Sequence, residues 1–169
     1  MSRGEMRKYR LWHRSASIFV INEFQEFCIN KRSSKKDYCP GWLDLSFGGV
    51  LNVENPDIGA KREAEEDMGI KDIHKIKLPG SSKTLEPNFL FKHRFEDNES
   101  PCWIYIYYLP WHSDLYNQGI IIKPKQDEIT SIHWLSPEEI QRRITQKSRI
   151  TPQSVEAFQN FMEWWENKN

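Results

Sequence analysis

Residues 48–70 read GGVLNVENPDIGAKREAEEDMGI and contain the clearest helix signals in the 169-residue chain. Asn55 is a preferred N-cap residue, Pro56 suits the first helical position, and Gly69 is typical of the residue that ends a helix. These signals predict a helix over residues 56–68.

Three acids of this predicted helix have the spacing of a single helix face. Glu63, Glu66 and Asp67 stand at i, i+3 and i+4, so their carboxylates converge. Like charges at these spacings destabilise a helix by roughly 0.2–0.5 kcal/mol per pair, and the helix dipole disfavours acids in the last turn. A divalent cation would offset both effects. Carboxylate oxygens are ligands suited to Mg²⁺, which in turn binds phosphate oxygens.

A solvated surface face, with Arg62 paired to Glu66, would also explain these charges. The spacing of fixed residues over the whole of 48–70 distinguishes a metal site from a solvated face. The chain fits a glycine, five residues, a glutamate, seven residues and then REUxEExGU, where U is aliphatic. The matching residues are Gly48, Glu54, Arg62, Glu63, Ala64, Glu66, Asp67, Gly69 and Ile70. A chance match at so many fixed positions is rare.

This pattern resembles the Nudix box, the signature of the Nudix hydrolase family, with two departures. Asp67 stands where the family has a second glutamate, and Ala64 replaces a larger aliphatic residue. Because Asp is one methylene shorter, it reaches an ion less easily, so we expect Asp67→Glu to keep or raise activity. If Gly48 is the first glycine of the box, five residues separate it from Glu54, as the family pattern requires. If Gly49 is the first glycine, one residue is missing before Glu54.

The resemblance implies an α/β architecture, the Nudix fold, in which a mixed β-sheet is packed between helices as an α/β/α sandwich. Residues 1–169 are expected to form one Nudix hydrolase domain. By resemblance, Glu54 and Arg62 orient the glutamates through a salt bridge. The implied catalytic residues are Glu54, Arg62, Glu63 and Glu66. The implied ligands of Mg²⁺, for which Mn²⁺ is an alternative, are Glu63, Glu66, Asp67 and the carbonyl of Gly48.

Outside this stretch, the pattern predicts strands and helices that interleave in one layered structure. Residues 16–21 and 24–32 are expected to be strands joined by a tight turn at Asn22 and Glu23. Further strands are expected at 88–95, 102–111 and 129–135, with helices from Ser136 to about 146 and from Thr151 onward. That last helix carries a core stripe of Val155, Phe158, Phe161, Met162 and Trp165. Loops 79–88 and 112–126 are candidate substrate lids.

A closer resemblance is to Nudix proteins similar to isopentenyl-diphosphate isomerase, through HRSAS at 13–17, KRSSKK at 31–36 and the later WLSPEEI. In that subgroup a basic loop contacts a diphosphate, which makes Arg32, Lys35 and Lys36 candidate substrate ligands; the alternative is a surface loop. The catalytic cysteine of an isomerase aligns with Gly48, which argues against isomerase chemistry.

Family members often take a further carboxylate from a loop remote from the box. The candidates here are Asp127 and Glu128, and the alternative is a solvated pair before a strand. Candidate base-stacking residues, each more often found in a core, are Trp42, Phe47, Phe91 and Trp103.

Composition restricts partners and location. The 24 Lys and Arg residues balance the 24 Asp and Glu residues, so no global charge favours nucleic acid or a membrane. Three cysteines without a CxxC pair fit neither a disulfide framework nor a thiolate zinc site, and no apolar segment is long enough to span a bilayer. We therefore expect a cytoplasmic protein acting on a small-molecule diphosphate, with no nucleic acid or membrane partner, as a monomer or homodimer.

Three functions remain open at this stage. The first is Mg²⁺-dependent cleavage of a diphosphate bond, in a nucleoside diphosphate-linked or related substrate, by water attack on phosphorus. The second is an isomerase similar to isopentenyl-diphosphate isomerase. The third is a catalytically weak Nudix domain that binds a nucleotide or a partner. The intact acids of the box favour the first.

Overall fold

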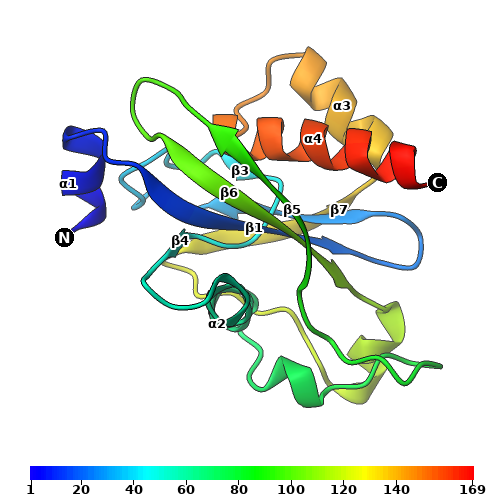
Figure 1. The fold of residues 1–169 in the computed structure, drawn as a ribbon. Helices are drawn as coiled ribbons and strands as arrows, with labels where there is room; N and C mark the ends of the chain where they lie inside the picture. The colour runs from blue at the N-terminus through cyan, green and yellow to red at the C-terminus, as the bar shows by residue number, and fades with distance from the viewer.

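A computed structural model describes all residues 1–169. A seven-stranded mixed sheet lies between α2 on one face and α3 and α4 on the other (Figure 1). The elements are α1 (Arg3–Lys8), β1 (His13–Ile21), β2 (Phe27–Arg32), β3 (Leu43–Asp44), β4 (Val50–Leu51), α2 (Pro56–Met68), η1 (Ile73–Lys75), β5 (Asn88–Phe95), β6 (Cys102–Pro110), η2 (Ser113–Gln118), β7 (Ile129–Leu135), α3 (Pro137–Thr145) and α4 (Pro152–Lys168). The expected α/β/α sandwich is confirmed.

Strand β1 is the centre of the sheet. It runs parallel to β6 and antiparallel to β2 and β4, and the main strand order is β3-β2-β1-β6-β5. All residues from Ser15 to Ile21 are buried. A strand covered on both faces is largely apolar, which explains the hydrophobic run from Ile18 to Ile21, although Ser15 and Ser17 are also buried.

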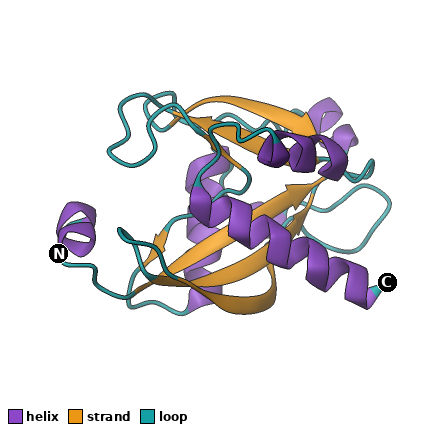
Figure 2. Ribbon diagram, turned by 90° about the horizontal axis from the view of Figure 1, so that it is seen from above, coloured by secondary structure: helices purple, strands orange, loops and turns teal.

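The sheet separates two apolar cores. The core on the α2 face contains Ala64 and Met68, whereas the core on the α4 face contains Phe158 and Phe161. Figure 2 shows α4 lying across the strands. The stripe predicted for this helix packs as expected, with Val155, Met162 and Trp165 partly buried beside the two phenylalanines. Ala64, the small residue of the box, is fully buried where α2 meets the sheet.

The prediction of a tight turn at Asn22 and Glu23, with the second strand starting at residue 24, was wrong. Strand β2 begins at Phe27, and the preceding three residues belong to the turn. The Asn22 side-chain oxygen accepts hydrogen bonds from the backbone N–H groups of Phe24 and Glu26, and Gln25 takes a positive φ of 62°. An asparagine that bonds to the backbone ahead of it favours a longer turn over strand continuation.

The two expected lids are also more structured than predicted. Loop 112–126 contains η2, whose Leu115 is fully buried in the α2-side core. Loop 79–88 begins beside a short bridge between Lys77 and Thr84 and contributes Leu85 to the same core. Four further short elements were not predicted from the sequence: β3, β4, η1 and α1, whose Ser2 and Glu5 form a capping box. No helix has both the length and the apolar character needed to span a membrane.

Candidate functional site

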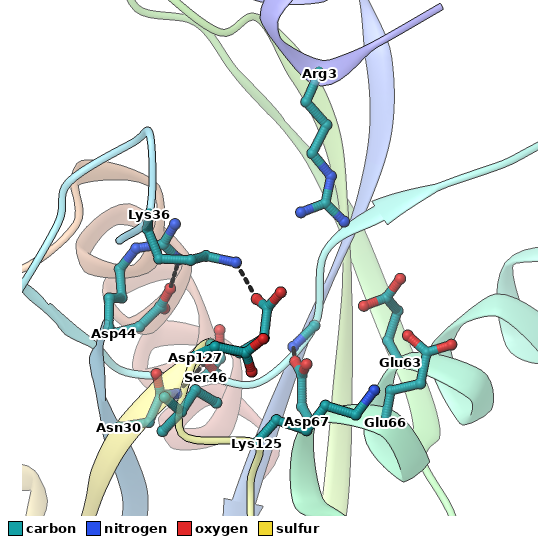
Figure 3. A pocket seen from close by; sticks show the side chains of 14 residues that line it. Arg3, Asn30, Lys36, Asp44, Ser46, Glu63, Glu66, Asp67, Lys125 and Asp127 are labelled. Atoms are coloured by element: carbon teal, nitrogen blue, oxygen red, sulfur yellow. Dashed lines mark hydrogen bonds and ion pairs between the residues drawn. The ribbon is translucent and has the colours of Figure 1, made fainter. Parts of the chain in front are cut away.

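A polar cavity of about 190 Å³ opens beside the C-terminal half of α2. It is bounded by α1, by β2 and the loop after it, by residues 44–48 and by residues 125–129 (Figure 3). Only one of its 14 lining residues, Ile129, is hydrophobic. The acids are Asp44, Glu63, Glu66, Asp67, Asp127 and Glu128, and the cations are Arg3, Arg32, Lys36 and Lys125. The lining therefore has two more carboxylates than cations, and Arg62, just outside it, is shared among Glu54, Glu63 and Glu66.

The helix that carries the central acids begins and ends as its sequence predicts. The Asn55 side chain accepts a hydrogen bond from the N–H of Asp57 at 2.9 Å, and Gly69 caps the C-terminus with φ 68°. A Cβ at Gly69 would lie 2.0 Å from the carbonyl oxygen of Lys123, so only glycine fits here. These two caps fix where α2 begins and ends, and the packing of Ala64 and Met68 in the core leaves the acidic face turned to the cavity.

Arg62 joins three acids of the box. Its guanidinium donates to Glu54 at 2.7 Å and to Glu63 at 2.8 Å, and it lies 3.5 Å from Glu66. Glu63 is 4% exposed and is therefore withdrawn from solvent, whereas the Glu66 side chain is 56% exposed and has the pairing with Arg62 expected of a solvated face. Burial raises the pKa of Glu63, and the nearby Arg62 opposes that rise. The salt bridge expected between Glu54 and Arg62 is present.

The two adjacent glycines have different structural roles. Gly48 has φ 133°, and a Cβ there would lie 2.1 Å from the carbonyl oxygen of Ala16 in β1. Its own carbonyl oxygen accepts no hydrogen bond within the chain. A Cβ on Gly49 would meet Glu63 Oε2 at 2.8 Å. Gly48 therefore fits against the strand, and Gly49 leaves room for the buried carboxylate.

Asp67 is tied to the same loop. Its Oδ2 accepts a hydrogen bond from the N–H of Gly48 at 2.9 Å. Burial raises the pKa of Asp67 to about 7, the Gly48 hydrogen bond lowers it, and the charge of Glu63 raises it further. Strongly shifted acids of this kind concentrate at functional sites. The shorter acid therefore matches the distance between the helix and the loop.

The basic loop is only partly in the cavity. Arg32 pairs with Asp44 at 3.3 Å, and Lys36 pairs with Glu128. Lys35 does not line the cavity, and its backbone N–H bonds to the Ser33 hydroxyl. Two of the three expected substrate ligands thus reach the site, and each already has a carboxylate partner.

The two expected remote carboxylates both line the cavity but differ in their contacts. Glu128 is paired with Lys36, whereas Asp127 is exposed and forms no ion pair. The sequence interpretation missed Asp44, Arg3 and Lys125 at this site. Asp44 interrupts the apolar run WLDLSF, which is a usable signal, while Arg3 and Lys125 carried none because only the fold brings their segments to α2.

A second group of ligand-type side chains lies outside the cavity. Atoms of Glu65, Asp72 and His74 lie within 4.8 Å of one another. Asp72 also pairs with Lys75 at 3.7 Å, and Glu65 accepts a hydrogen bond from the N–H of Ile73 at 3.2 Å. None of the three residues lines the cavity, so this group is a separate candidate for a metal site.

The cavity has the donor set of a site for a hard divalent cation. Glu63, Glu66 and Asp67 present carboxylate oxygens to one space, and the unused carbonyl of Gly48 belongs to the adjoining loop (Figure 3). Oxygen donors of this kind suit Mg²⁺ or Mn²⁺. The net negative charge of the cavity would be offset by one such ion.

The chain matches the model of the NUDIX domain over residues 11–160. That match covers the cavity except for Arg3. The chain belongs to the NUDIX domain family. It is 31% identical to the uncharacterized Nudix hydrolase YfcD of Salmonella typhi, over 95% of this chain and 76% of that protein. It is 30% identical to YfcD of Escherichia coli strain K12, over 95% and 78%.

Solved structures confirm the Nudix fold. A MutT protein from Methanosarcina mazei Go1 superposes with a TM-score of 0.67 at 23% identity, over 94% of this chain and 96% of that one. A MutT NUDIX hydrolase from Burkholderia pseudomallei gives 0.60 at 17% identity, over 88% and 96%. Membership in this family makes the chain a hydrolase that acts on anhydride bonds of phosphorus compounds.

Proposed function

We propose that the protein is a Mg²⁺-dependent hydrolase that cleaves the diphosphate bond of a nucleoside diphosphate-linked or related small molecule by water attack on phosphorus. The supporting observation is the cavity at α2, where six acids outnumber four cations. A diphosphate would be repelled by such a cavity unless a divalent cation balanced its charge.

Glu63, Glu66 and Asp67 would hold the ion, with the carbonyl of Gly48 as a further donor. A bound Mg²⁺, or Mn²⁺, would polarise the phosphate oxygens and activate the attacking water. Arg62 orients Glu63 by a 2.8 Å ion pair, and Glu54 in turn holds Arg62 at 2.7 Å. This arrangement keeps the buried carboxylate directed into the cavity, as outer-sphere partners of metal ligands commonly do.

The remaining charged groups would bind the phosphate oxygens of the substrate and accept the proton of the attacking water. Lys36 and Arg32 are placed to bind phosphate oxygens, with Lys36 exchanging its partner Glu128 for the substrate. Asp127 lines the same cavity and has no cationic partner. We therefore propose Asp127, rather than Glu128, as the carboxylate that accepts a proton from the attacking water.

The rival functions have less support. An isomerase-like chemistry would need a reactive thiol, but Gly48 occupies the aligned position, and burial raises the pKa of Cys39, the nearest cysteine in sequence. A binding-only domain would not need the converging acids. We also propose that residues 1–169 act as one domain in the cytoplasm, where Cys28, Cys39 and Cys102 stay as free thiols.

One experiment tests the proposed hydrolysis. The protein is incubated with Mg²⁺ and a panel of nucleoside triphosphates, ADP-ribose, dinucleoside polyphosphates, FAD, CoA and isopentenyl diphosphate, and product release is measured. Glu66→Gln should lower turnover by at least roughly ten- to a hundredfold, because it removes a metal-binding charge without changing shape. Glu65→Gln, on the same helix but outside the cavity, is the matched control and should stay active.

Two results would contradict the proposal. Absence of turnover on every compound, with binding retained, would support the binding-only function. A fully active Glu66→Gln enzyme would show that this carboxylate does not hold the metal.

A further inference from the structure

A second recess adjoins the metal cavity, and its lining has more basic than acidic side chains. It has a volume of about 120 Å³ and shares Arg3, Arg32, Lys36 and Asp44 with the cavity. Arg7 of α1 and His13 of β1 line the recess but not the cavity. Four Arg and Lys side chains and one acid, Asp44, line it. Three of the four cations are ion-paired, with partners Asp44, Asp37 and Glu128, and Arg3 has no ion pair. An anionic group bound here would meet the unpaired guanidinium of Arg3 and, beside it, the guanidinium of Arg7, whose carboxylate partner Asp37 lies outside the recess.

The recess is also rich in hydroxyl groups and poor in exposed aromatic surface. Six Ser and Thr side chains line it. Its two aromatic residues are unsuited to stacking: Phe47 is 1% exposed, and Tyr38 is flanked by guanidinium groups, with Arg7 at 5.0 Å and Arg32 at 5.8 Å from the ring centroid. A nucleobase needs an open ring or apolar wall to stack on, and the recess offers neither.

The small volume of the site also argues against a nucleotide. The cavity and the recess measure about 190 and 120 Å³. Together they stand at the lower end of the roughly 300–1,000 Å³ typical of ligand pockets. A compact polar substrate fits this space better than a dinucleotide.

From these observations we infer that the recess takes a second anionic group of the substrate, so that the enzyme prefers the diphosphate of a small, hydroxylated and phosphorylated carbon skeleton to a nucleotide. This inference rests on the proposed diphosphate hydrolysis. The diphosphate would lie at the acids of α2, while Arg7 and His13 contact the distal phosphate. Arg3 has no ion pair, extends from α1 towards the cavity (Figure 3) and lines both spaces, so it would contact either group.

The test compares three diphosphates with the full chain and Mg²⁺: 5-phosphoribosyl 1-diphosphate, ADP-ribose and isopentenyl diphosphate. The first combines a sugar, a diphosphate and a separate phosphate; the second carries a base; the third has neither hydroxyl nor further anion. We expect kcat/KM to be at least roughly tenfold higher for 5-phosphoribosyl 1-diphosphate, since one charge-assisted hydrogen bond has about that effect. A preference for ADP-ribose would overturn the inference.

Arg7→Met tests the recess itself, because Arg7 does not line the metal cavity. KM for 5-phosphoribosyl 1-diphosphate should rise roughly tenfold with kcat retained, while isopentenyl diphosphate is unaffected. Arg7 also pairs with Asp37 at 2.8 Å. Asp37→Asn breaks that pair but keeps the guanidinium, so this control should preserve the preference. Equal losses on both substrates in Arg7→Met would refute a role in binding the distal phosphate.

Binding of ribose 5-phosphate, measured by calorimetry, separates this inference from the proposed function. Saturable binding that Arg7→Met weakens would support the recess even if no diphosphate is hydrolysed. If diphosphates are hydrolysed but ribose 5-phosphate neither binds nor competes, the hydrolysis proposal stands and the inference fails.

Discussion

Asp67→Glu is the substitution on which the sequence and the structure disagree. From the box alone, the longer acid should keep or raise activity, because it restores the usual reach. In the structure, Asp67 Oδ2 already lies 2.9 Å from the Gly48 nitrogen. Gly48 cannot retreat, because a Cβ there would lie 2.1 Å from the Ala16 carbonyl oxygen, which shows how closely it packs against β1. We now expect the substitution to be harmful.

Either way of accommodating the extra methylene has a similar cost. Forcing it into the packed space destabilises by about 1–3 kcal/mol, and swinging the carboxylate away leaves the N–H of Gly48 without its acceptor, at about 1–3 kcal/mol. For a chain of this size, each kcal/mol lowers Tm by roughly 2–4 °C. Displacing a ligand by about 1 Å lowers turnover by roughly a hundredfold.

Thermal unfolding and steady-state turnover with Mg²⁺ are the two assays. Asp114→Glu, the same change at an exposed acid of η2, is the control and should alter neither quantity. If Asp67→Glu unfolds at the wild-type temperature with equal or higher turnover, then the Gly48 contact does not constrain this position.

Three further changes test the packing around the site and the second core. Gly49→Ala should lower turnover without unfolding the protein, because the new Cβ meets Glu63 Oε2 at 2.8 Å; Gly4→Ala in α1, whose Cβ would meet only Ser2 Oγ at an ordinary 3.9 Å, is its control. Phe161→Ala should destabilise by about 3–5 kcal/mol in denaturant titrations, since its ring is fully buried between the sheet and α4. Burial lowers the pKa of His93 below its ordinary 6.5, so the unfolded state binds the proton more readily. Stability should therefore fall as the pH drops below 6.5, and His93→Leu should reduce that fall; an unchanged pH dependence would exclude this residue as the cause.

The sequence predicted most of the fold because its signals were local. The helix Pro56–Met68 has its own caps, and β5 and β7 follow aromatic and β-branched runs, so these elements begin and end where expected. The hairpin turn failed because FQE continues a strand-like pattern, and only the side chain of Asn22 ends it. The parallel pairing of β1 with β6 joins segments about 90 residues apart, which no local pattern encodes.

The candidate site divides in the same way. The acids of α2 were found because helix geometry alone brings them together, whereas Asp44, Arg3 and Lys125 reach the cavity from three separate segments. The pairing of Lys36 with Glu128 was also hidden, since the sequence treated one as a substrate ligand and the other as a remote acid. Because Lys36 and Glu128 are paired, Lys36 can bind a substrate only by leaving Glu128, and Glu128 is a free carboxylate only after that exchange.

That exchange links the charge of the cavity to the order of binding. With six acids and four cations, the cavity itself is negative, and Lys36 is held by Glu128 rather than directed at a ligand. A divalent cation at Glu63, Glu66 and Asp67 would neutralise this excess, and only then would a diphosphate gain by drawing Lys36 away from Glu128. The recess lies beside this site, and its lining has four Arg and Lys side chains but one acid, with Arg3 free of any ion pair. A metal at the acids of α2 and the guanidinium groups of α1 would thus favour one orientation of the substrate, with its diphosphate at the metal and its other anionic group at α1.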